Sequence, residues 1–529
     1  MFVPLVPLRF LHRAVDVFGN KVGIVSGDRQ FTYREFAARV EKLATGLAKT
    51  GIQPGDRVAF LSFNTNQLVE GYYGVPQARA IVMPLNVRLT AFELTNILNH
   101  SGAKMLIFEN DFASVVEQLK PACKGVEHWV TADGSSPLAD MTYEQILGQG
   151  HPERADIFTY DELAIAELFY TSGSTGTPKG VMLSHRTLYL HALDIATMMK
   201  EPETAVDLHT IPLFHANGWG RPQCSTMLGC KQIMVRRFEP AGVFKLIREH
   251  RATQMSLVPT MANALLNAPE LATADLSSLR QVMLGGAASS PELVERLEKA
   301  FGCVCHGGYG LTETAPVATT ARFKGTFEYG SDAERYRRQA MAGWPVPGVS
   351  VRVVDPEMKD VARDGQAIGE VVIMGDHVME GYYKEPEQTA AVMSGKWFHT
   401  GDMAVWDEEN YIHIVDRKKE IIISGGENIS SLEVEKAIFA HPAVFECAVV
   451  AAPDERWGEV PAAIVVLKPG QTVSEAELLE FLMQRLGKFK LPRLIRFQEE
   501  QLPKTGTGKI RKLILRENFW KGKEKRVQG

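Results

Sequence analysis

Residues 170–180 read YTSGSTGTPKG, a stretch in which three glycines alternate with hydroxyl side chains and one lysine. Glycines let the backbone turn tightly and bring its N–H groups close to a ligand. The apolar runs on either side, 168–170 and 181–183, predict short strands. The stretch therefore predicts a hairpin-like flap over a polyphosphate, with Lys179 as a flexible positive charge. The groups expected at the phosphates belong to Thr171, Ser172, Gly173, Ser174, Thr175, Gly176, Thr177 and Lys179.

This glycine-rich stretch is not a Walker A loop, because the GxxxxGK[ST] spacing is absent and no helix follows at once. A solvated turn is the competing interpretation, since turns rich in glycine and serine are common. The composition of the stretch does not separate the two interpretations. Motifs elsewhere in the chain have to decide.

Such motifs follow in order along the chain. They are YGLTET at 309–314, TGD at 400–402, DRKKEIIISGGENIS at 416–430 and PKTGTGK at 503–509. With the first loop, this series resembles the adenylate-forming superfamily, which contains acyl-CoA synthetases, luciferases and the adenylation domains of peptide synthetases. The resemblance runs from about residue 31 to about residue 511, nearly the whole chain.

Helical and strand patterns alternate through the first part of the chain. Apolar residues recur at helical spacing in 31–48, 92–99 and 240–250, and strand patterns follow at 56–61, 105–108 and 254–258. Such alternation favours an α/β architecture with largely parallel sheets. A chain of 529 residues also exceeds a single hydrophobic core, so we expect at least two domains.

The texture changes after about Trp397, where short strands are punctuated by glycines and the segment 416–420 carries charges without apolar residues. We place the domain boundary there. Residues 1–416 should form a large N-terminal domain of layered β-sheets and helices, and residues 417–529 a small α+β domain. Within it, 433–439 and 475–486 predict helices, while 446–450 and 462–467 predict strands. The resemblance implies that the small domain is a mobile lid.

Composition and charge exclude several classes of function. A net charge of −5 gives no electrostatic case for binding nucleic acid. No apolar run is long enough to span a bilayer, although the apolar segment 1–11 leaves loose membrane association open. Six irregularly spaced cysteines suit a reducing compartment, so we expect a cytoplasmic protein. Cys303 and Cys305 have no second ligand pair and predict buried thiols rather than zinc ligands. A homodimer is an open alternative to a monomer.

The resemblance gives roles to the residues of the nucleotide site. Tyr309 would stack on adenine, Thr312 would meet the α-phosphate, and Glu313 would hold Mg²⁺ with Thr171 near the metal. Asp402 resembles the aspartate that accepts both ribose hydroxyls, and a carboxylate is suited to this because it only accepts hydrogen bonds. Further nucleotide contacts are expected from Gly286, Ala287, Gly308 and Arg417. Gly307 departs from the family, since many relatives carry Asn or Gln beside the adenine.

Lys509 is the residue we expect to drive the first half-reaction. A cation beside both a carboxylate and an α-phosphate gains about 4 kcal/mol per pair at 4 Å and an effective dielectric constant of 20. By resemblance, Lys419 is the pivot of the lid. The turn of Ser424, Gly425 and Gly426 would lie on the CoA side once the lid rotates.

The acid-binding pocket is expected around Gly310 and the segment PLFHANGWG at 212–220. Acetyl-CoA synthetases resemble this chain but carry tryptophan where Gly310 stands, so glycine predicts a deep apolar pocket for medium or long chains. His215 resembles a residue that adjusts the thiol and carboxylate, and Trp219 resembles a gating tryptophan. A capped turn histidine and a core tryptophan are the structural alternatives. The aspartate that amino-acid-activating relatives use here is absent.

The resemblance thus implies an AMP-forming acyl-CoA synthetase, with Lys509, Glu313, Thr312 and His215 as catalytic residues. Its substrates would be a medium- or long-chain fatty acid, ATP and CoA, with Mg²⁺. One alternative is a ligase for a short substituted acid, such as methylthiopropionate or an aryl acid. Others are a carrier-protein loading enzyme and a silent nucleotide-binding protein. Because the chain ends soon after Lys509, we expect free CoA rather than a fused carrier domain.

Overall fold

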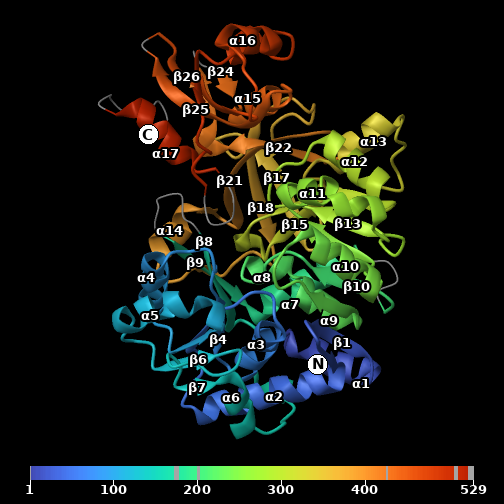
Figure 1. Cartoon of the computed structure of the whole chain (residues 1–529), viewed down its shortest axis with the longest axis vertical. Helices are drawn as coiled ribbons and strands as arrows, with labels where there is room; N and C mark the ends of the chain where they lie inside the picture. The colour runs from blue at the N-terminus through green and yellow to red at the C-terminus, as the bar shows by residue number, and fades with distance from the viewer. Residues whose placement is uncertain are drawn as a thin grey trace. The chain divides into compact units, whose positions relative to one another are not determined.

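The computed structural model describes residues 2–171, 178–198, 203–424, 427–454, 456–504 and 510–521. Contacts between residues divide the chain into two compact units, each treated by itself here (Figure 1). The larger unit comprises Met1–Val351, Ile373–Phe398 and Asn410–Ile412, and the smaller unit Arg352–Val372, His399–Glu409 and His413–Gly529.

The larger unit contains two extended β-sheets. In the first, parallel pairing joins β1, β11, β10, β12, β13 and β14 in that order, and antiparallel strands close both edges. Intervening helices connect successive parallel strands, as right-handed crossover topology requires. The strand order is β16 (Trp344–Pro345), β15 (Val317–Thr320), β14 (Val304–Gly310), β13 (Gln281–Leu284), β12 (Gln254–Leu257), β10 (Val206–His209), β11 (Lys231–Met234), β1 (Val22–Ser26) and β2 (Arg29–Thr32).

The second sheet is also parallel at its centre and carries an antiparallel hairpin near one edge. Its central strands are apolar along nearly their whole length, which is typical of strands covered on both faces. The order is β19 (Gly381–Tyr382), β9 (Lys179–Ser184), β8 (Ile165–Thr171), β4 (Ile81–Pro84), β3 (Arg57–Leu61), β5 (Met105–Phe108), β6 (His128–Thr131) and β7 (Met141–Thr142).

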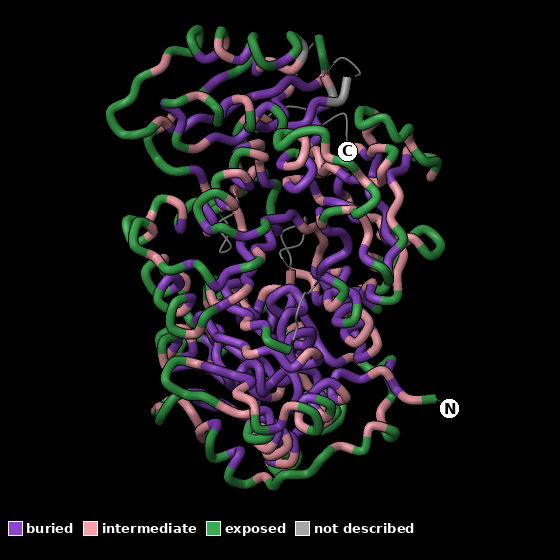
Figure 2. The backbone as a smooth tube through the Cα atoms, turned by 90° about the vertical axis from the view of Figure 1, so that its right-hand side faces the viewer, coloured by how far each residue is buried: buried purple, intermediate pink, exposed green. Residues whose placement is uncertain are grey.

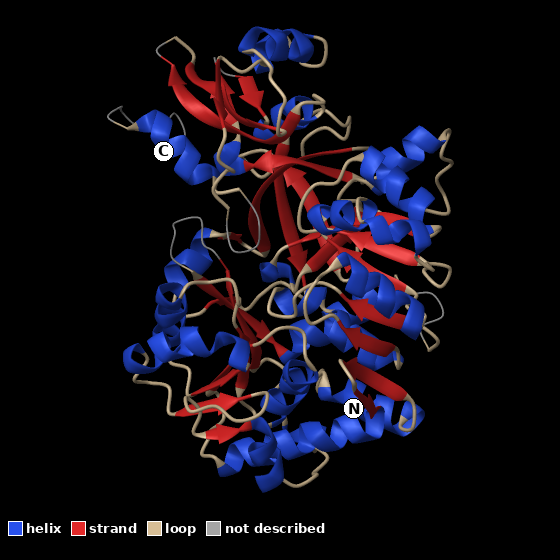
Figure 3. Cartoon of the chain, in the orientation of Figure 1, coloured by secondary structure: helices blue, strands red, loops and turns tan. Residues whose placement is uncertain are grey.

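Helices flank these sheets (Figure 3). The second of them, α2 (Tyr33–Lys49), begins with a capping box between Thr32 and Glu35 and buries Phe36, Val40 and Leu43 on one face. The other helices of the larger unit are α1 (Leu8–Phe18), α3 (Asn66–Gln77), α4 (Ala91–Ser101), α5 (Ala113–Ala122), α6 (Tyr143–Gln149), α7 (His185–Ala196), α8 (Ala216–Trp219), α9 (Arg221–Leu228), α10 (Pro240–His250), α11 (Pro259–Leu266), α12 (Pro291–Phe301), α13 (Asp332–Gln339) and α14 (Pro386–Ala391).

A third sheet contains the boundary between the units, which falls within its strands. Its order is β17 (Val349–Val354), β18 (Gly369–Gly375), β21 (Trp397–Trp406) and β20 (Met393–Ser394), with β22 (Ile412–Arg417) paired to β21. The chain therefore passes from one unit to the other more than once.

The smaller unit has a sheet of its own, in which a long antiparallel pair is extended by a parallel strand. Its helices bury Val434, Ile438, Leu478 and Leu482 in a core beneath the sheet, and the buried strand residues appear in purple in Figure 2. The strands are β24 (Glu427–Ile429), β23 (Ile422–Ser424), β26 (Gly458–Leu467), β25 (Val444–Asp454) and β27 (Leu494–Gln498), and the helices α15 (Ser431–Phe439), α16 (Glu475–Met483) and α17 (Lys512–Trp520).

The α/β fold expected from the sequence is confirmed, and the helices and strands anticipated in both parts of the chain are present. The boundary at residues 416 and 417 stays a prediction, because the contacts also assign 352–372 and 399–409 to the smaller unit.

Two expectations about apolar and sulfur-bearing residues can be compared with the structure. Val6, Leu8 and Leu11 lie in the main core, so burial accounts for the apolar composition of segment 1–11 without a membrane. Cys303 and Cys305 are buried free thiols, as expected. In the part of the chain that the structure describes, no helix is both long and apolar enough to cross a membrane.

Candidate active site

The glycine-rich stretch lies between two antiparallel strands, as the sequence predicted. Strand β8 pairs with β9 in a register that places Thr171 opposite Lys179 and Tyr170 opposite Gly180. The hairpin therefore holds the two ends of the loop together, one residue pair away from the sheet. The loop residues Ser172, Gly173, Ser174, Thr175, Gly176 and Thr177 lie outside the described residues.

Tyr382 connects the predicted phosphate lysine with the predicted metal ligand. The Lys179 ammonium lies 4.8 Å from the centre of the Tyr382 ring, a cation–π distance. The Tyr382 hydroxyl donates a hydrogen bond of 2.9 Å to Glu313 Oε1. Burial and the neighbouring Glu313 carboxylate raise the pKa of Tyr382, so this hydroxyl keeps its proton. The sequence analysis missed Tyr382; its position on β19, paired with β9, depends on a contact that no local pattern reveals.

The predicted nucleotide residues follow the end of β14. Gly308 and Tyr309 are partly exposed strand residues paired with Thr320 and Thr319 of β15. Thr312 and Glu313 then form the short 3₁₀ turn η4 (Thr312–Thr314), whose start leaves backbone N–H groups available to an anion. The structure thus brings the aromatic, hydroxyl and carboxylate groups together on consecutive residues.

Backbone packing explains why Gly307 departs from the family pattern. A Cβ atom at this position would lie 2.2 Å from the Met341 carbonyl oxygen. An Asn or Gln side chain therefore has no room at position 307 in this backbone arrangement, and the amide that many relatives direct at adenine cannot be supplied from here.

The turn after β13 meets the predicted gating tryptophan. Gly286 and Ala287 are exposed, whereas Gly285 is buried. A Cβ atom on Gly285 would come within 2.9 Å of the Trp219 ring, and one on Gly286 within 3.4 Å of it. The indole of Trp219, itself 5% exposed, therefore packs against the glycine turn that the sequence assigned to the nucleotide site.

The segment that carries Trp219 has an unusual backbone. Residues 216–220 have consecutive φ angles of 44°, 43°, 59°, 63° and 72°, and three of these residues are not glycine. The left-handed region costs an L-residue about 1–2 kcal/mol. Strain of this kind persists only where surrounding contacts impose it, and it is concentrated at functional sites. We call Pro212–Gly220 the gate segment; His215 lies in it, partly buried, immediately before α8.

A buried carboxylate contacts the gate segment from β8. Glu167 is fully buried and accepts hydrogen bonds from Asn217 Nδ2 at 2.9 Å and from Gln223 Nε2 at 2.8 Å. Burial raises the pKa of Glu167 to about 8, although the two amide donors oppose the shift. The sequence analysis did not single out Glu167, but an acidic residue within the apolar run 164–170 was the available signal.

Gly310 does not face the open apolar space that the sequence analysis expected. A Cβ atom there would lie 1.7 Å from the Pro316 carbonyl oxygen and 3.0 Å from the Ala318 nitrogen. Glycine is required because two backbone segments meet at this point. The inference of a deep pocket from the absence of tryptophan at position 310 is therefore wrong.

The predicted ribose and hinge residues belong to the smaller unit. Asp402 is 3% exposed, and its Oδ1 forms an ion pair of 2.7 Å with Arg417 Nε. Lys419 lies in the 3₁₀ turn η5 (Lys418–Glu420), directly after β22. Ser424 ends β23. Gly425, Gly426 and Lys509 lie outside the described residues.

The hinge segment 416–420 is tied to α15 and α17 by a buried ion cluster. Lys512 Nζ lies 2.8 Å from Glu435 Oε1 and 2.7 Å from Ser431 Oγ, and 3.7 Å from Glu420 Oε2. Asp416 Oδ2 accepts hydrogen bonds from the first backbone N–H groups of α15. Burial raises the pKa values of Asp416 and Glu435. Burial alone would lower the pKa of Lys512, but the surrounding carboxylates more than offset it and the pKa is raised.

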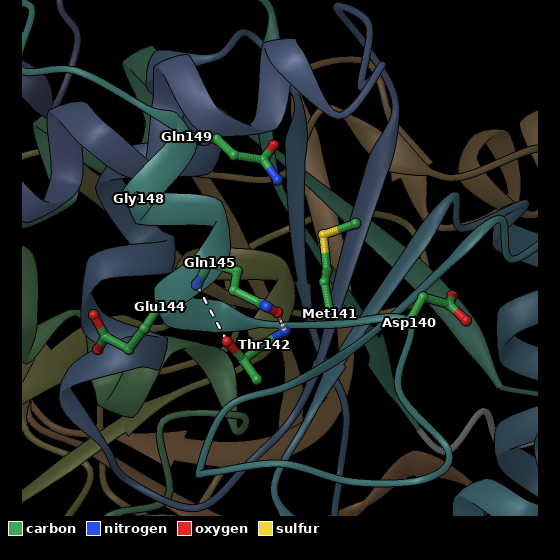
Figure 4. A pocket seen from close by; sticks show the side chains of 7 residues that line it. All are labelled: Asp140, Met141, Thr142, Glu144, Gln145, Gly148 and Gln149. Atoms are coloured by element: carbon green, nitrogen blue, oxygen red, sulfur yellow. Dashed lines mark hydrogen bonds between the residues drawn. The ribbon is translucent and has the colours of Figure 1, made fainter.

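Two other features are not part of this constellation. A surface depression is lined by residues of β7 and α6, where the capping hydrogen bonds between Thr142 and Gln145 explain its shape, and it contains no predicted site residue (Figure 4). The acidic group Glu109, Asp111 and Asp133 lies against Arg236 and Arg237, which pair with two of its members.

Comparisons with known proteins agree with the motifs. Residues 11–383 match the family model described as AMP-binding enzyme, and residues 433–509 match the AMP-binding enzyme C-terminal domain. The chain is 39% identical over 521 residues to a long-chain-fatty-acid–CoA ligase of Thermus thermophilus, covering 96% of this chain and 95% of the relative. It is 37% identical over 531 residues to a 2-methylpropanoate–CoA ligase of Humulus lupulus, covering 97% and 95%.

Solved structures share the whole architecture. An anthranilate CoA ligase in complex with anthranoyl-AMP matches with a TM-score of 0.86 and 26% identity, covering 98% of each chain. The family model alone spans more than half of the sequence, and the ordered motifs, the hairpin and the η4 turn all lie within matched or aligned regions. The chain belongs to the AMP-binding enzymes, in the adenylate-forming superfamily.

Proposed function

We propose that this chain is an AMP-forming acyl-CoA ligase that activates an apolar carboxylic acid, with medium- or long-chain fatty acids as the first candidates. The observation that carries the proposal is the arrangement of Lys179, Tyr382 and Glu313 beside the β8–β9 hairpin. It joins a cation for phosphates to a carboxylate for a metal. Membership of the family supports the reaction class, and the Thermus thermophilus relative supports the acid.

In the proposed reaction, a carboxylate oxygen attacks the α-phosphorus of ATP and the bond to the β-phosphate breaks, which yields acyl-AMP and pyrophosphate. The CoA sulfur then attacks the acyl carbon and AMP leaves. Both steps need electrostatic stabilisation more than covalent help. Lys179 and the 172–177 loop would hold the phosphates, and Lys509 would neutralise the reacting oxygens.

Magnesium fits the groups present. The Thr171 hydroxyl and the Glu313 carboxylate are the oxygen ligands that Mg²⁺ prefers, and Tyr382 orients Glu313 through one oxygen. When bound, the ion would screen the charge of the triphosphate. Tyr309 and Thr312 would position adenine and α-phosphate, and Asp402 with Arg417 the ribose. Lys419 would act as the pivot that brings Ser424, Gly425 and Gly426 toward CoA.

The choice of acid rests on the gate segment. Among its residues, PLFHANGWG, there is no Asp, Glu, Lys or Arg, and Trp219 is buried. This favours an apolar acid and disfavours an amino acid. A short branched or aryl acid is the second candidate, because Trp219 packs against the Gly285–Gly286 turn and the Humulus lupulus and anthranilate relatives are named for such acids. The six buried free cysteines support a cytoplasmic location.

Release of AMP, measured over acids from acetate to palmitate with branched, thioether and aryl acids included, tests the proposal. We expect AMP only when ATP, an acid, CoA and Mg²⁺ are all present, with the highest kcat/KM for a medium- or long-chain acid. A requirement for a carrier protein instead of CoA, or no turnover with any acid, would contradict it.

Lys509→Ala separates the two half-reactions. Because this cation should act only while the adenylate forms, its loss should appear in kcat of that step. We expect adenylate formation to be abolished, while transfer from supplied acyl-AMP to CoA continues. Equal losses in both steps would contradict the role of Lys509.

A further inference from the structure

We propose that Glu167 is a positioning residue that holds the left-handed end of the gate segment and so fixes Trp219 beside the acid. The inference rests on the proposed function, because it requires the chain to adenylate a carboxylic acid. It adds a specificity-determining role for a residue that lies behind the gate segment, on the strand that leads into the phosphate loop.

The first step concerns the position of Glu167. It lies four residues before Thr171 on β8, where it pairs with Val82 of β4 and Leu183 of β9 in the middle of the sheet. Neighbours on both sides therefore fix its backbone. Its side chain is fully buried, so the carboxyl group has no solvent to reach and must direct its oxygens to protein donors.

The second step concerns what those oxygens hold. One accepts from Asn217, which is 1% exposed and lies inside the left-handed run. The same Asn217 amide accepts a hydrogen bond of 2.6 Å from the Gly220 nitrogen through Oδ1. Asn217 therefore bridges Glu167 to the far end of the run. The other oxygen accepts from Gln223 in α9, the helix that follows.

The opposite end of the gate segment has its own fixed contacts. Asn64 Oδ1 accepts from the Leu213 nitrogen at 2.8 Å, and the Tyr72 hydroxyl donates to the Leu213 oxygen at 2.6 Å. Those contacts hold the start of the segment without reaching the left-handed run. Glu167 thus supplies the side-chain anchor at the end where the backbone is strained and where Trp219 lies.

The third step connects the anchor to the acid. Trp219 has a positive φ of 63° and packs on the Gly285–Gly286 turn, so its ring position depends on the backbone of the run. Without the hydrogen bond from Asn217 to Glu167, the run can relax toward unstrained φ angles. The indole would then leave the glycine turn and change the space available to the alkyl or aryl part of the acid.

One unsatisfied atom predicts which substitution preserves the anchor. Gln223 Oε1 is buried, and within the described part of the chain it has no hydrogen-bond partner. In Glu167→Gln, the new amide can accept from Asn217 through its oxygen and donate through its nitrogen to Gln223 Oε1. Glu167→Leu has similar volume but offers no acceptor. The pair separates hydrogen bonding from packing.

The experiment compares Glu167→Leu, Glu167→Gln and a control, Glu70→Leu, in the adenylation half-reaction. Glu70 is likewise fully buried in the larger unit, where Arg39, Asn66 and Tyr143 donate to it, and it does not contact the gate segment. The KM for the acid, the KM for ATP, kcat and the chain-length profile are measured below the melting temperature of every variant.

We expect Glu167→Leu to lower kcat/KM for the preferred acid about 10- to 100-fold, mainly through KM for the acid, and to flatten the chain-length profile. The KM for ATP should change less than about twofold. Glu167→Gln should stay within about twofold of the unmodified chain, and Glu70→Leu should leave the profile unchanged even where it lowers the melting temperature.

A Glu167→Leu variant with unchanged acid KM and profile would overturn the inference, as would the same profile change in Glu70→Leu. If Glu167→Leu does not fold, Asn217→Gly provides the second variant, since glycine tolerates the left-handed angle but removes the amide. It should show the same shift in acid KM, and an unchanged profile would again overturn the inference. Failure of the proposed function is distinguishable, because the unmodified chain itself would then release no AMP.

Discussion

The gate segment of the larger unit and the hinge segment of the smaller unit are both held by buried carboxylates, but their partners differ. Glu167 has two neutral amide donors, and among the described residues no lysine or arginine pairs with it. Asp416 and Glu435 surround the buried ammonium group of Lys512. A neutral network tolerates an isosteric amide, whereas a buried ion cluster cannot lose its cation without leaving uncompensated charge.

Lys512→Met should have the largest effect, because it removes the cation and leaves Glu435, Asp416 and Glu420 without their shared partner. Breaking a buried pair from one side costs about 3–5 kcal/mol. We expect amide hydrogen exchange in α15 and β25 of the full chain to accelerate accordingly, with little change in the larger unit.

Lys490→Met is the matched control for this cluster. Lys490 forms an ion pair of 2.7 Å with Glu433 in the same unit, but Glu433 is 45% exposed. Such a pair contributes about 1 kcal/mol or less. Lys512→Arg should retain most of the protection. Equal exchange rates in Lys512→Met and Lys490→Met would show that the hinge does not depend on the buried charge.

Gly310→Ala sharpens the comparison, since position 310 is held by backbone rather than by any side chain. The added Cβ would lie 1.7 Å from the Pro316 carbonyl oxygen, and neither segment can yield by a rotamer change. Overpacking of this kind costs about 1–3 kcal/mol or more. We expect a lower melting temperature and a loss of kcat/KM that is equal for short and long acids.

Gly242→Ala is the control, because its added Cβ in α10 meets nothing within 4 Å. It should be neutral or slightly stabilising, since alanine favours the helix. A Gly310→Ala variant of full stability with a preference shifted to short acids would restore the view that Gly310 opens the acid pocket.

The parts of this chain that the sequence predicted are those governed by local pattern. Helix α2 follows from its capping box and apolar spacing, and the hairpin around residues 172–177 from its flanking apolar runs. The family motifs placed Tyr309, Thr312 and Glu313 on consecutive residues, and the structure agrees. These features depend on neighbours in sequence.

The parts that the sequence did not predict depend on contacts between distant segments. Tyr382 joins Lys179 to Glu313 across about 200 and about 70 residues of chain, and Glu167 meets Asn217 across 50. Gly310 was interpreted as empty space because the backbone of residues 316–318 could not be placed against it. A missing side chain indicates a cavity only where nothing else fills the position.

The pH dependence of stability provides the smallest and most direct test of the comparison, because it reports whether Glu167 lacks a cation. The pKa of Glu167 is raised from 4.5 to about 8 in the folded chain. Below pH 4.5 the carboxyl group is protonated in both the folded and the unfolded state. Between 4.5 and about 8 only the folded state keeps the proton, so unfolding releases it and stability falls as pH rises, by up to about 1.4 kcal/mol per pH unit.

Glu167→Gln removes this proton, and therefore the difference in free energy of unfolding between variant and unmodified chain should grow in favour of the variant as pH rises. The other titrating groups are common to both proteins and cancel in the difference. Urea denaturation at about pH 5 and at pH 8 measures it. A carboxylate paired with a cation would have a lowered pKa and give no such slope in this range. A flat difference would thus mean that Glu167 is ionised and held as Glu435 is, and the contrast between the gate segment and the hinge segment would disappear.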